Sequence, residues 1–130
     1  MVDASRLGAV PARTFEGAAF RHVAPKYDPR SGEGARLHGG RFNPPGSYPV
    51  LYLCMTRPCV VAELIRFGRA QAIGVQALLP RALYRYRVRV TRVLDLTNEA
   101  VLTSLDISGE VVVGEGWAAT QELGAAAHRL

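Results

Sequence analysis

The sequence predicts a single α+β domain, and three observations support this prediction. Residues Leu83–Val90 (LYRYRVRV) alternate aromatic or aliphatic with basic side chains, which is typical of a strand with one solvated face. Residues Arg57–Phe67 carry apolar side chains at helical spacing. Between the two strand-like stretches Ala19–Val23 and Val50–Cys54 the chain has no periodicity, and a loop of that length usually has a function.

A chain of 130 residues fits one domain by size, so we treat residues 1–130 as one unit of folding. We expect residues 1–18 to be a flexible N-terminal segment. The stretch Gly32–Gly46 (GEGARLHGGRFNPPG) contains five glycines and two prolines, and we expect no regular helix or central strand there.

The helix after the second strand has a recognisable start. Thr56 suits the N-cap position, Pro58 suits the first turn, and Gly68 is a natural stop. Its expected core stripe is Val60, Val61, Leu64 and Ile65. Beyond Val90 we expect a strand at Val93–Leu96, a helix capped by Thr97 or Asn98 and running to about Leu105, an extended piece at Val111–Val113, and a helix over Trp117–Leu130.

Composition excludes several classes of protein. The longest apolar run, Val50–Met55, is far shorter than the roughly 20 residues that cross a bilayer. The N-terminus has no continuous apolar region of the signal-peptide kind, so we expect a cytoplasmic protein. Cys54 and Cys59 have no histidine pair nearby, and we expect buried thiols and no metal site.

The net charge of +5 raises the question of a polyanionic partner. Fifteen of the sixteen basic residues are arginine, and Lys26 is the only lysine. Arginine offers a planar fork for phosphate or carboxylate, but coding by a GC-rich genome explains the same composition equally well. The arginines at 85, 87 and 89 line one face of a strand without interleaved aromatic residues, which favours a solvated face over a nucleic-acid site.

Glu63 borders the apolar stripe of the predicted helix. One interpretation is a surface pair with Arg66 three residues on, which contributes a few tenths of a kcal/mol. The other is a functional carboxylate, because Tyr52 on the preceding strand can point toward the same cleft. A lone carboxylate beside an aromatic ring and several arginines suits an anionic sugar phosphate.

Two arginines complete the candidate set. Arg41 follows two glycines and precedes Pro44-Pro45, so the backbone can turn tightly and form an anion-binding nest; an ordinary solvated loop is the alternative. Arg21 lies within a predicted strand, where arginine is more often paired than free.

These residues resemble the RES-domain toxins, the toxic halves of bacterial toxin–antitoxin pairs whose antitoxins carry an Xre-type helix-turn-helix. The resemblance covers most of the chain from about Ala19. It rests on Phe20-Arg21, SGEGAR (Ser31–Arg36), GGRFNPPG (Gly39–Gly46), PVLYL (Pro49–Leu53), the helix bearing Glu63, YRVRVTRVLDLT (Tyr86–Thr97) and GWAATQELG (Gly116–Gly124).

The resemblance implies an ADP-ribosyltransferase-like fold, with mixed β-sheets and short flanking helices, and an attack on NAD. It implies transfer of ADP-ribose to phosphate, water or a protein, and no metal. Glu63, Arg21 and Tyr52 correspond to catalytic residues. The NAD-binding set is Arg21, His22, Arg41, Phe42, Asn43 and Tyr52. Nicotinamide leaves as a neutral molecule, so one carboxylate suffices to stabilise the oxocarbenium-like transition state.

The chain departs from the family pattern at its C-terminal end. The family serine is usually found there, whereas this chain stops at Leu130 and has Ala118 in place of a hydroxyl-bearing residue. We therefore expect that the C-terminal part of the family fold is missing. A catalytically weakened protein that binds its antitoxin or NAD is one alternative, and a basic nucleic-acid-binding domain is a less favoured one.

Overall fold

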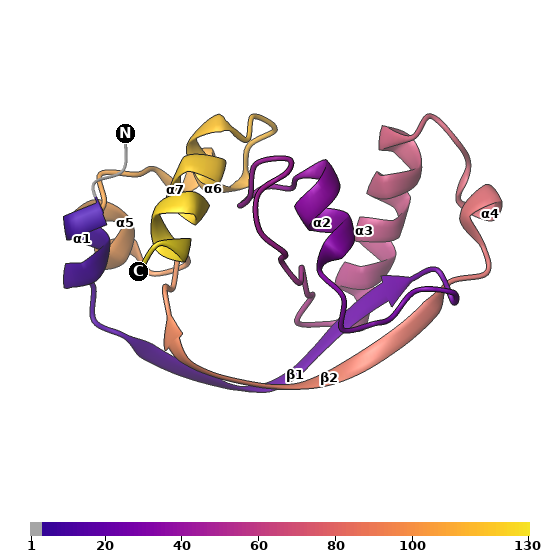
Figure 1. Ribbon diagram of the computed structural model, residues 1–130, viewed down its shortest axis with the longest axis horizontal. Coiled ribbons are helices and arrows are strands. Elements are labelled where there is room, and N and C mark those ends of the chain that lie inside the picture. The colour runs from indigo at the N-terminus through magenta and orange to yellow at the C-terminus, as the bar shows by residue number, and fades with distance from the viewer. Residues whose placement is uncertain (1–3) are drawn as a thin grey trace. The chain divides into compact units, whose positions relative to one another are not determined.

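The protein, described here by a computed structural model over residues 4–130, has the expected α+β class. Strands β1 (Arg13–Val23) and β2 (Ala82–Val93) pair in an antiparallel sheet (Figure 1). The helices are α1 (Ala4–Ala9), α2 (Glu33–His38), α3 (Arg57–Ala70), α4 (Val75–Leu78), α5 (Glu99–Ser104), α6 (Gly109–Val113) and α7 (Ala118–His128). None of them is both long and apolar enough to span a bilayer.

The chain divides into two compact units. Unit 1 contains the described residues up to Thr14, together with Gly32–Val50 and Val90–Leu130. Unit 2 contains Phe15–Ser31 and Leu51–Arg89. The first 18 residues, expected to be flexible, include helix α1 and the start of β1 in their described part.

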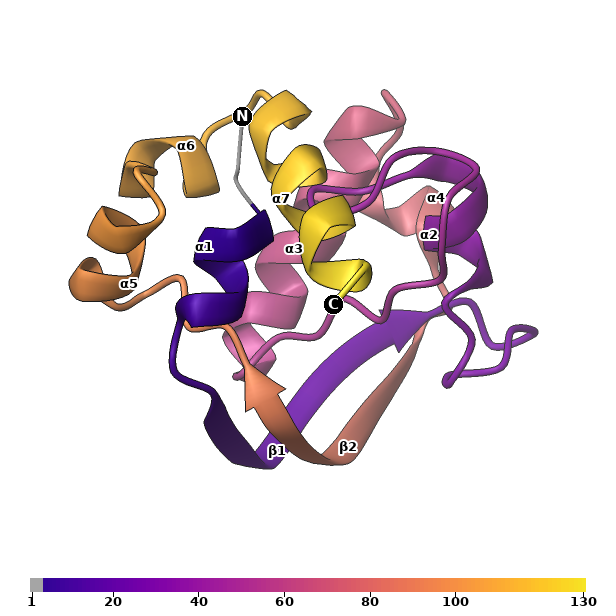
Figure 2. The ribbon, with the colours of Figure 1, turned by 60° about the vertical axis from the view of Figure 1, so that its left-hand side comes forward.

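The core of unit 1 lies where α1 and α7 pack side by side (Figure 2). Leu7, Leu105, Leu123 and Ala126 are almost completely buried there. Phe42 packs against this core from the glycine-rich stretch. The burial of these apolar side chains is the main favourable term for unit 1, because each large side chain contributes about 1.5–3 kcal/mol.

Side-chain caps explain both a confirmed helix and a wrong prediction. Asn98 Oδ1 accepts from Ala100 N at 2.9 Å and starts α5 as expected. Ser108 Oγ accepts from Val111 N at 3.3 Å and starts α6. The expected extended piece at Val111–Val113 is therefore wrong, because the cap outweighs the β-preference of three valines.

The expected strand at Val93–Leu96 is also wrong, because β2 ends at Val93. Asp95 Oδ1 accepts from Thr97 N at 3.0 Å and from Thr97 Oγ1 at 2.5 Å. This local turn takes the chain out of the extended conformation. The helix over Trp117–Leu130 is confirmed as α7.

Helix α3, in unit 2, starts as predicted, with Thr56 Oγ1 accepting from Cys59 N at 3.3 Å. It continues past Gly68 to Ala70, so the predicted stop is wrong. Its core stripe is narrower than expected. Val60 is buried, whereas Val61 and Ile65 are 57% and 39% exposed.

The segment Val50–Cys54 is not a strand, because its only ladder contact among the described residues is the bridge from Cys54 to Phe20. The alternating side chains of this segment predicted an extended chain. They could not show whether a neighbouring strand pairs with it. Cys54 and Cys59 form a disulfide with a Cα–Cα distance of 5.7 Å, so the prediction of free buried thiols is wrong. The bridge and the start of α3 bring the two residues within bonding distance.

The glycine-rich stretch contains α2, so the expectation of no helix there is wrong as well. Glu33 pairs with Arg36 one turn later, which stabilises this short helix. Gly39 ends it at φ 77°, and its N–H donates to Ala35 O at 2.8 Å. A Cβ at Gly39 would lie 2.9 Å from the Pro45 ring, so glycine is required there.

Strand β2 confirms the alternation predicted for LYRYRVRV. Tyr84 and Tyr86 are half-buried, and the arginines at 85, 87 and 89 are exposed to solvent. These three arginines take part in none of the ion pairs within residues 4–130. The arginine face is therefore a solvated strand face, as expected.

Candidate functional site

The predicted site residues are divided between the two units. Unit 2 holds Arg21, His22, Tyr52 and Glu63, and unit 1 holds Arg41, Phe42 and Asn43.

Glu63 lies in the middle of α3 with its side chain 53% exposed. Its carboxylate is 4.0 Å from Arg66 Nη1, so the surface pair considered from the sequence is present. Such an exposed pair contributes well below 1 kcal/mol. The carboxylate is therefore held only loosely, and most of its surface is open to a ligand.

Arg21 on β1 orders the loop that follows the strand. Its Nη1 donates to Pro29 O and to Ser31 O, both at 3.0 Å. The hydroxyl of Tyr86 on β2 donates to the same Pro29 carbonyl. Arg21 is thus bound to carbonyls rather than to a carboxylate, so its positive charge is not neutralised by these contacts.

His22, the next residue of β1, is held by an arginine that the sequence did not single out. Arg81 Nε and Nη2 lie 3.2 Å and 3.1 Å from His22 Nδ1. The Arg81 guanidinium lies over the Phe67 ring at 5.6 Å, and the His22 ring meets Phe67 edge-on at 6.4 Å. Phe67 is one turn after Glu63 on α3, so both side chains leave the same face of that helix.

Electrostatics keep the His22 ring neutral. Burial lowers the pKa of His22 below its usual value, and the positive charges of Arg81 and Arg21 lower the pKa further. Burial also lowers the pKa of Arg81, with a further contribution from Arg21. An imidazole in this position is therefore an uncharged hydrogen-bonding group.

Tyr52 lies in the extended segment before the Cys54–Cys59 disulfide, with 37% of its surface exposed. Cys59 is one turn before Glu63 on α3. The disulfide therefore ties the segment that carries Tyr52 to the helix that carries Glu63. Both residues belong to unit 2.

In unit 1, Arg41 fastens the glycine-rich stretch to the connection between α6 and α7. Its Nη1 donates to Val112 O at 3.0 Å and to Gly114 O at 2.5 Å. Its guanidinium also lies 5.9 Å from the Trp117 ring. Two of its five N–H groups are used in these bonds, so the others can still bind an anion.

Phe42 and Asn43 have structural contacts within unit 1. Asn43 is completely buried, and its Nδ2 donates to Ala35 O at 2.7 Å. The Phe42 side chain packs on the core, and its carbonyl accepts from Tyr48 Oη at 2.7 Å. Both residues therefore shape the loop on which Arg41 stands.

Sequence reasoning missed Arg81 and Phe67. The contact between Arg81 and His22 joins residues 59 positions apart, and no local sequence pattern predicts it. Phe67 was expected only as the end of a helix. The signal that was available is modest: an arginine directly after Leu79-Pro80 and before a strand, at a distance from any acidic residue.

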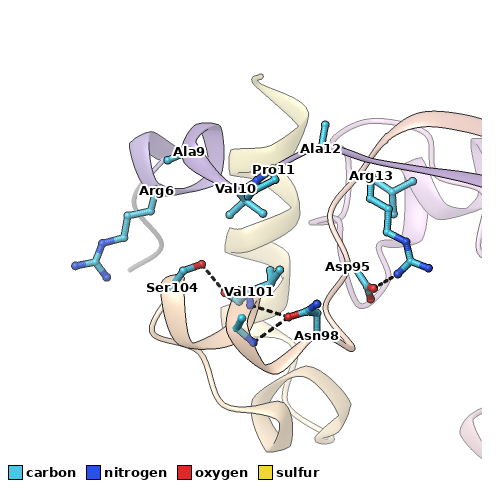
Figure 3. Close-up of a pocket in the computed structure, with 12 residues that line it drawn as sticks. Arg6, Ala9, Val10, Pro11, Ala12, Arg13, Asp95, Asn98, Val101 and Ser104 are labelled. Atoms are coloured by element: carbon cyan, nitrogen blue, oxygen red, sulfur yellow. Dashed lines mark hydrogen bonds and ion pairs between the residues drawn. The ribbon is translucent and has the colours of Figure 1, made fainter.

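A separate cavity of about 470 Å³ lies in unit 1, between the end of α1, Pro11 and α5 (Figure 3). Several of its polar side chains already have partners. Arg13 pairs with Asp95, Asn98 caps α5, and Ser104 Oγ donates to Val101 O at 2.8 Å. It contains none of the predicted site residues. A ligand site needs polar groups directed at the ligand, so this cavity is not the candidate site.

No cluster of metal-ligating side chains occurs among residues 4–130. The arrangement in unit 2 is instead an exposed carboxylate on a helix, an arginine held by carbonyls, and a neutral imidazole held by a second arginine. Such a set can bind a phosphate-bearing sugar and stabilise positive charge that develops on it.

Comparison with known proteins identifies the class. Residues 14–130 match the RES domain, so the chain belongs to the RES-domain family. This confirms the resemblance seen in the sequence.

Particular relatives make the similarity more specific. The chain is 32% identical over 124 residues to the NAD(+) phosphorylase MbcT of Mycobacterium tuberculosis, and equally to that of Mycobacterium bovis. The match covers 94% of this chain and 67% of MbcT. The fold is also similar to the crystal structure of the M. tuberculosis MbcT-MbcA toxin-antitoxin complex. The TM-score is 0.82 at 29% identity, with 97% of this chain and 70% of that chain covered.

Proposed function

We propose that this protein is the toxin of a toxin–antitoxin pair and cleaves the nicotinamide–ribose bond of NAD, with phosphate as the acceptor. The observation that carries the proposal is the match to the NAD(+) phosphorylase MbcT along 94% of the chain. The exposed Glu63 and the cations of unit 2 support it, because they provide the charges that the reaction needs.

In the reaction, the bond between the ribose C1 and the nicotinamide nitrogen breaks, and a phosphate oxygen forms a new bond to C1. The ring nitrogen is cationic in NAD and takes the bonding electrons, so nicotinamide leaves neutral without a proton donor. Positive charge moves to the ribose during this step. The Glu63 carboxylate stabilises that charge and orients the ribose hydroxyls.

Binding residues neutralise the diphosphate of NAD. In unit 2, Arg21 binds it with the N–H groups that its carbonyl contacts do not use. Arg41, in unit 1, is assigned to NAD binding by the family resemblance alone. Tyr52 packs against the nicotinamide or its ribose, and His22 donates a hydrogen bond. Phe42 and Asn43 hold the loop of Arg41 in place. Water or a protein as the acceptor of ADP-ribose are alternatives that product analysis distinguishes.

The partner that we propose is a cognate antitoxin with an Xre-type helix-turn-helix. The structural neighbour was solved as a toxin-antitoxin complex, which supports an antitoxin but not its type. We place both proteins in the cytoplasm, where NAD is the available substrate. Direct nucleic-acid binding by this chain is not part of the proposal, since the β2 arginines form a solvated face.

The test is nicotinamide release from NAD, measured with and without phosphate. We expect release that requires phosphate and a product phosphorylated at the ribose C1. Glu63→Gln should lower kcat by at least about a hundredfold, which is typical of losing a transition-state electrostatic contact, while NAD binding persists. Glu122→Gln is the matched control, because Glu122 is an exposed glutamate on α7 in unit 1.

Three other outcomes have clear meanings. Undiminished release by Glu63→Gln would remove Glu63 from the site. Wild-type protein that binds NAD or antitoxin without releasing nicotinamide would be the weakened RES protein considered above. Affinity for DNA or RNA that falls steeply with salt and ignores Glu63 would indicate the nucleic-acid-binding alternative.

A further inference from the structure

The contact between Arg81 and His22 has a feature that ordinary surface arginines lack. Two N–H groups of one guanidinium converge on a single imidazole nitrogen, at 3.2 Å and 3.1 Å. A guanidinium can only donate, so Nδ1 must accept. A neutral imidazole that accepts at Nδ1 carries its proton on Nε2. The contact therefore sets the tautomer of His22 and leaves an Nε2–H donor.

Phe67 fixes the ring plane. The His22 ring meets Phe67 with an interplanar angle of 64° and a centroid distance of 6.4 Å, a favourable edge-on arrangement. The same Phe67 ring carries the Arg81 guanidinium at 5.6 Å. One aromatic ring on α3 thus holds both members of the pair, one helical turn from Glu63.

Arg81 pairs with no carboxylate in the part of the chain that the structure describes. The charged groups that act on His22 are both cations, Arg21 on its own strand and Arg81 before β2. A structural arginine normally meets a carboxylate or a set of carbonyls. Here two N–H groups of the Arg81 guanidinium instead donate to the side chain of His22, which belongs to the candidate site.

We propose that Arg81 is a positioning residue of the NAD site, which holds His22 neutral and oriented so that its Nε2–H donates to the bound substrate. This proposal rests on the proposed function for the identity of the substrate. The neutral state matters because a cationic imidazole would oppose the positive charge that develops on the ribose. Arg81 acts through His22 and does not itself need to contact NAD.

The first experiment needs no turnover. The chain has only three histidines, so imidazole signals of ¹⁵N-labelled protein can be assigned with a His22→Phe variant. We expect His22 to titrate below its ordinary pKa in the wild type, and Arg81→Gln to raise its pKa. Arg81→Lys keeps the charge and should keep the pKa low. An unchanged His22 pKa in Arg81→Gln would overturn the proposal.

The second experiment is a double-mutant cycle on nicotinamide release. Arg81→Gln should lower kcat/KM about tenfold in the wild-type background, the effect of losing one hydrogen bond to a charged group. In the His22→Phe background the same change should cost less than about twofold, because its effect passes through His22. An equal loss in both backgrounds would mean that Arg81 acts on substrate or fold directly, which contradicts the proposal.

The two proposals fail in different ways. Wild-type protein that releases no nicotinamide would refute the proposed function, and the titration would still decide whether Arg81 controls His22. Should Arg81→Gln fail to fold by circular dichroism, Arg81→Lys takes its place in the cycle. That variant loses the fork, so it should lower kcat/KM in the wild-type background and have little effect beside His22→Phe. An equal loss in both backgrounds would overturn the proposal here too.

Discussion

Asn43 is completely buried in unit 1, and its side chain orders the glycine-rich stretch through hydrogen bonds. Its amide nitrogen donates to Ala35 O at 2.7 Å and to Pro44 O at 3.4 Å. The Nδ2 position needs a donor, because two carbonyl oxygens accept from it. The sequence indicated Asn43 as part of an NAD-binding motif, and the contacts show how it orders the loop beside Arg41.

Replacing Asn43 should reveal this requirement for a donor. We expect Asn43→Ala to lower the free energy of unfolding by about 2 kcal/mol, because a buried hydrogen-bonding group is lost and a small void remains. Asn43→Asp has nearly the same shape but should cost more, since the carboxylate oxygen that replaces Nδ2 would face the carbonyl oxygens of Ala35 and Pro44. Urea unfolding followed by circular dichroism measures both, and an Asp variant as stable as the wild type would contradict this account.

His22 should give the protein a pH-dependent stability. Its pKa in the folded chain is below the ordinary value of 6.5, mainly through burial and then through Arg81 and Arg21. Well above pH 6.5 the ring is neutral in both the folded and the unfolded state, and the effect is absent. As the pH falls from 6.5 toward the folded pKa, the unfolded chain takes up the proton first, so stability is lost.

Thermal unfolding between pH 7.5 and pH 5 measures this loss. We expect His22→Gln to flatten the decline of stability below about pH 6.5. His38→Gln is the control, because His38 is exposed at the end of α2. A decline of the same steepness in His22→Gln and in the wild type would show that other groups cause it.

At the scale of elements, α7 and the glycine-rich stretch approach each other closely in unit 1. A Cβ on Gly124 would lie 1.8 Å from Phe42 O, a distance that no arrangement of these backbones allows. Gln121 Nε2 on the same helix donates to Gly40 O at 2.9 Å. The loop that carries Arg41 therefore packs directly against the backbone of helix α7.

Two helical glycines provide a matched pair of variants. We expect Gly124→Ala to destabilise the protein by about 1–3 kcal/mol, because the loop must move away from α7. At Gly8 in α1 an added Cβ would meet no neighbouring atom of the described residues within 4 Å, so Gly8→Ala should be neutral or stabilising by up to about 1 kcal/mol. Comparing the two midpoints of urea unfolding checks the prediction; equal effects would refute the close contact.

The disulfide should matter for the stability of unit 2. Cys54 and Cys59 enclose a short loop, for which a chain-entropy calculation gives about 2 kcal/mol. We expect Cys54→Ser, Cys59→Ser and the double variant to lose similar amounts, since each breaks the same bond. A thiol titration of the unfolded wild type that found two free cysteines would contradict the prediction.

Prediction of elements from the sequence succeeded where local signals and packing agree. Thr56 and Asn98 start helices as expected, and the alternating stretch 83–90 lies within β2. It was wrong where a side-chain contact overrides propensity, as at Val111–Val113. It was also wrong where a strand needs a partner that the sequence does not reveal, as at Val50–Cys54.

For the whole molecule, short motifs in a fixed order predicted the family, and the match over residues 14–130 confirms it. The order of the motifs is visible along the chain, whereas the contacts between them are not. The pairing of Arg81 with His22 joins residues 59 positions apart in the sequence. The site roles of Arg21, His22, Arg41, Tyr52 and Glu63 stay predictions until the enzyme assays are done.

The scarcity of lysine has a practical use in unit 2. Lys26 is exposed, lies 5.2 Å from the Tyr27 ring, and belongs to the loop whose carbonyls hold Arg21. Because it supplies the only side-chain amine, an amine-reactive fluorophore has one side-chain attachment point in the whole chain. Its emission would report on that loop as NAD or an antitoxin is titrated in.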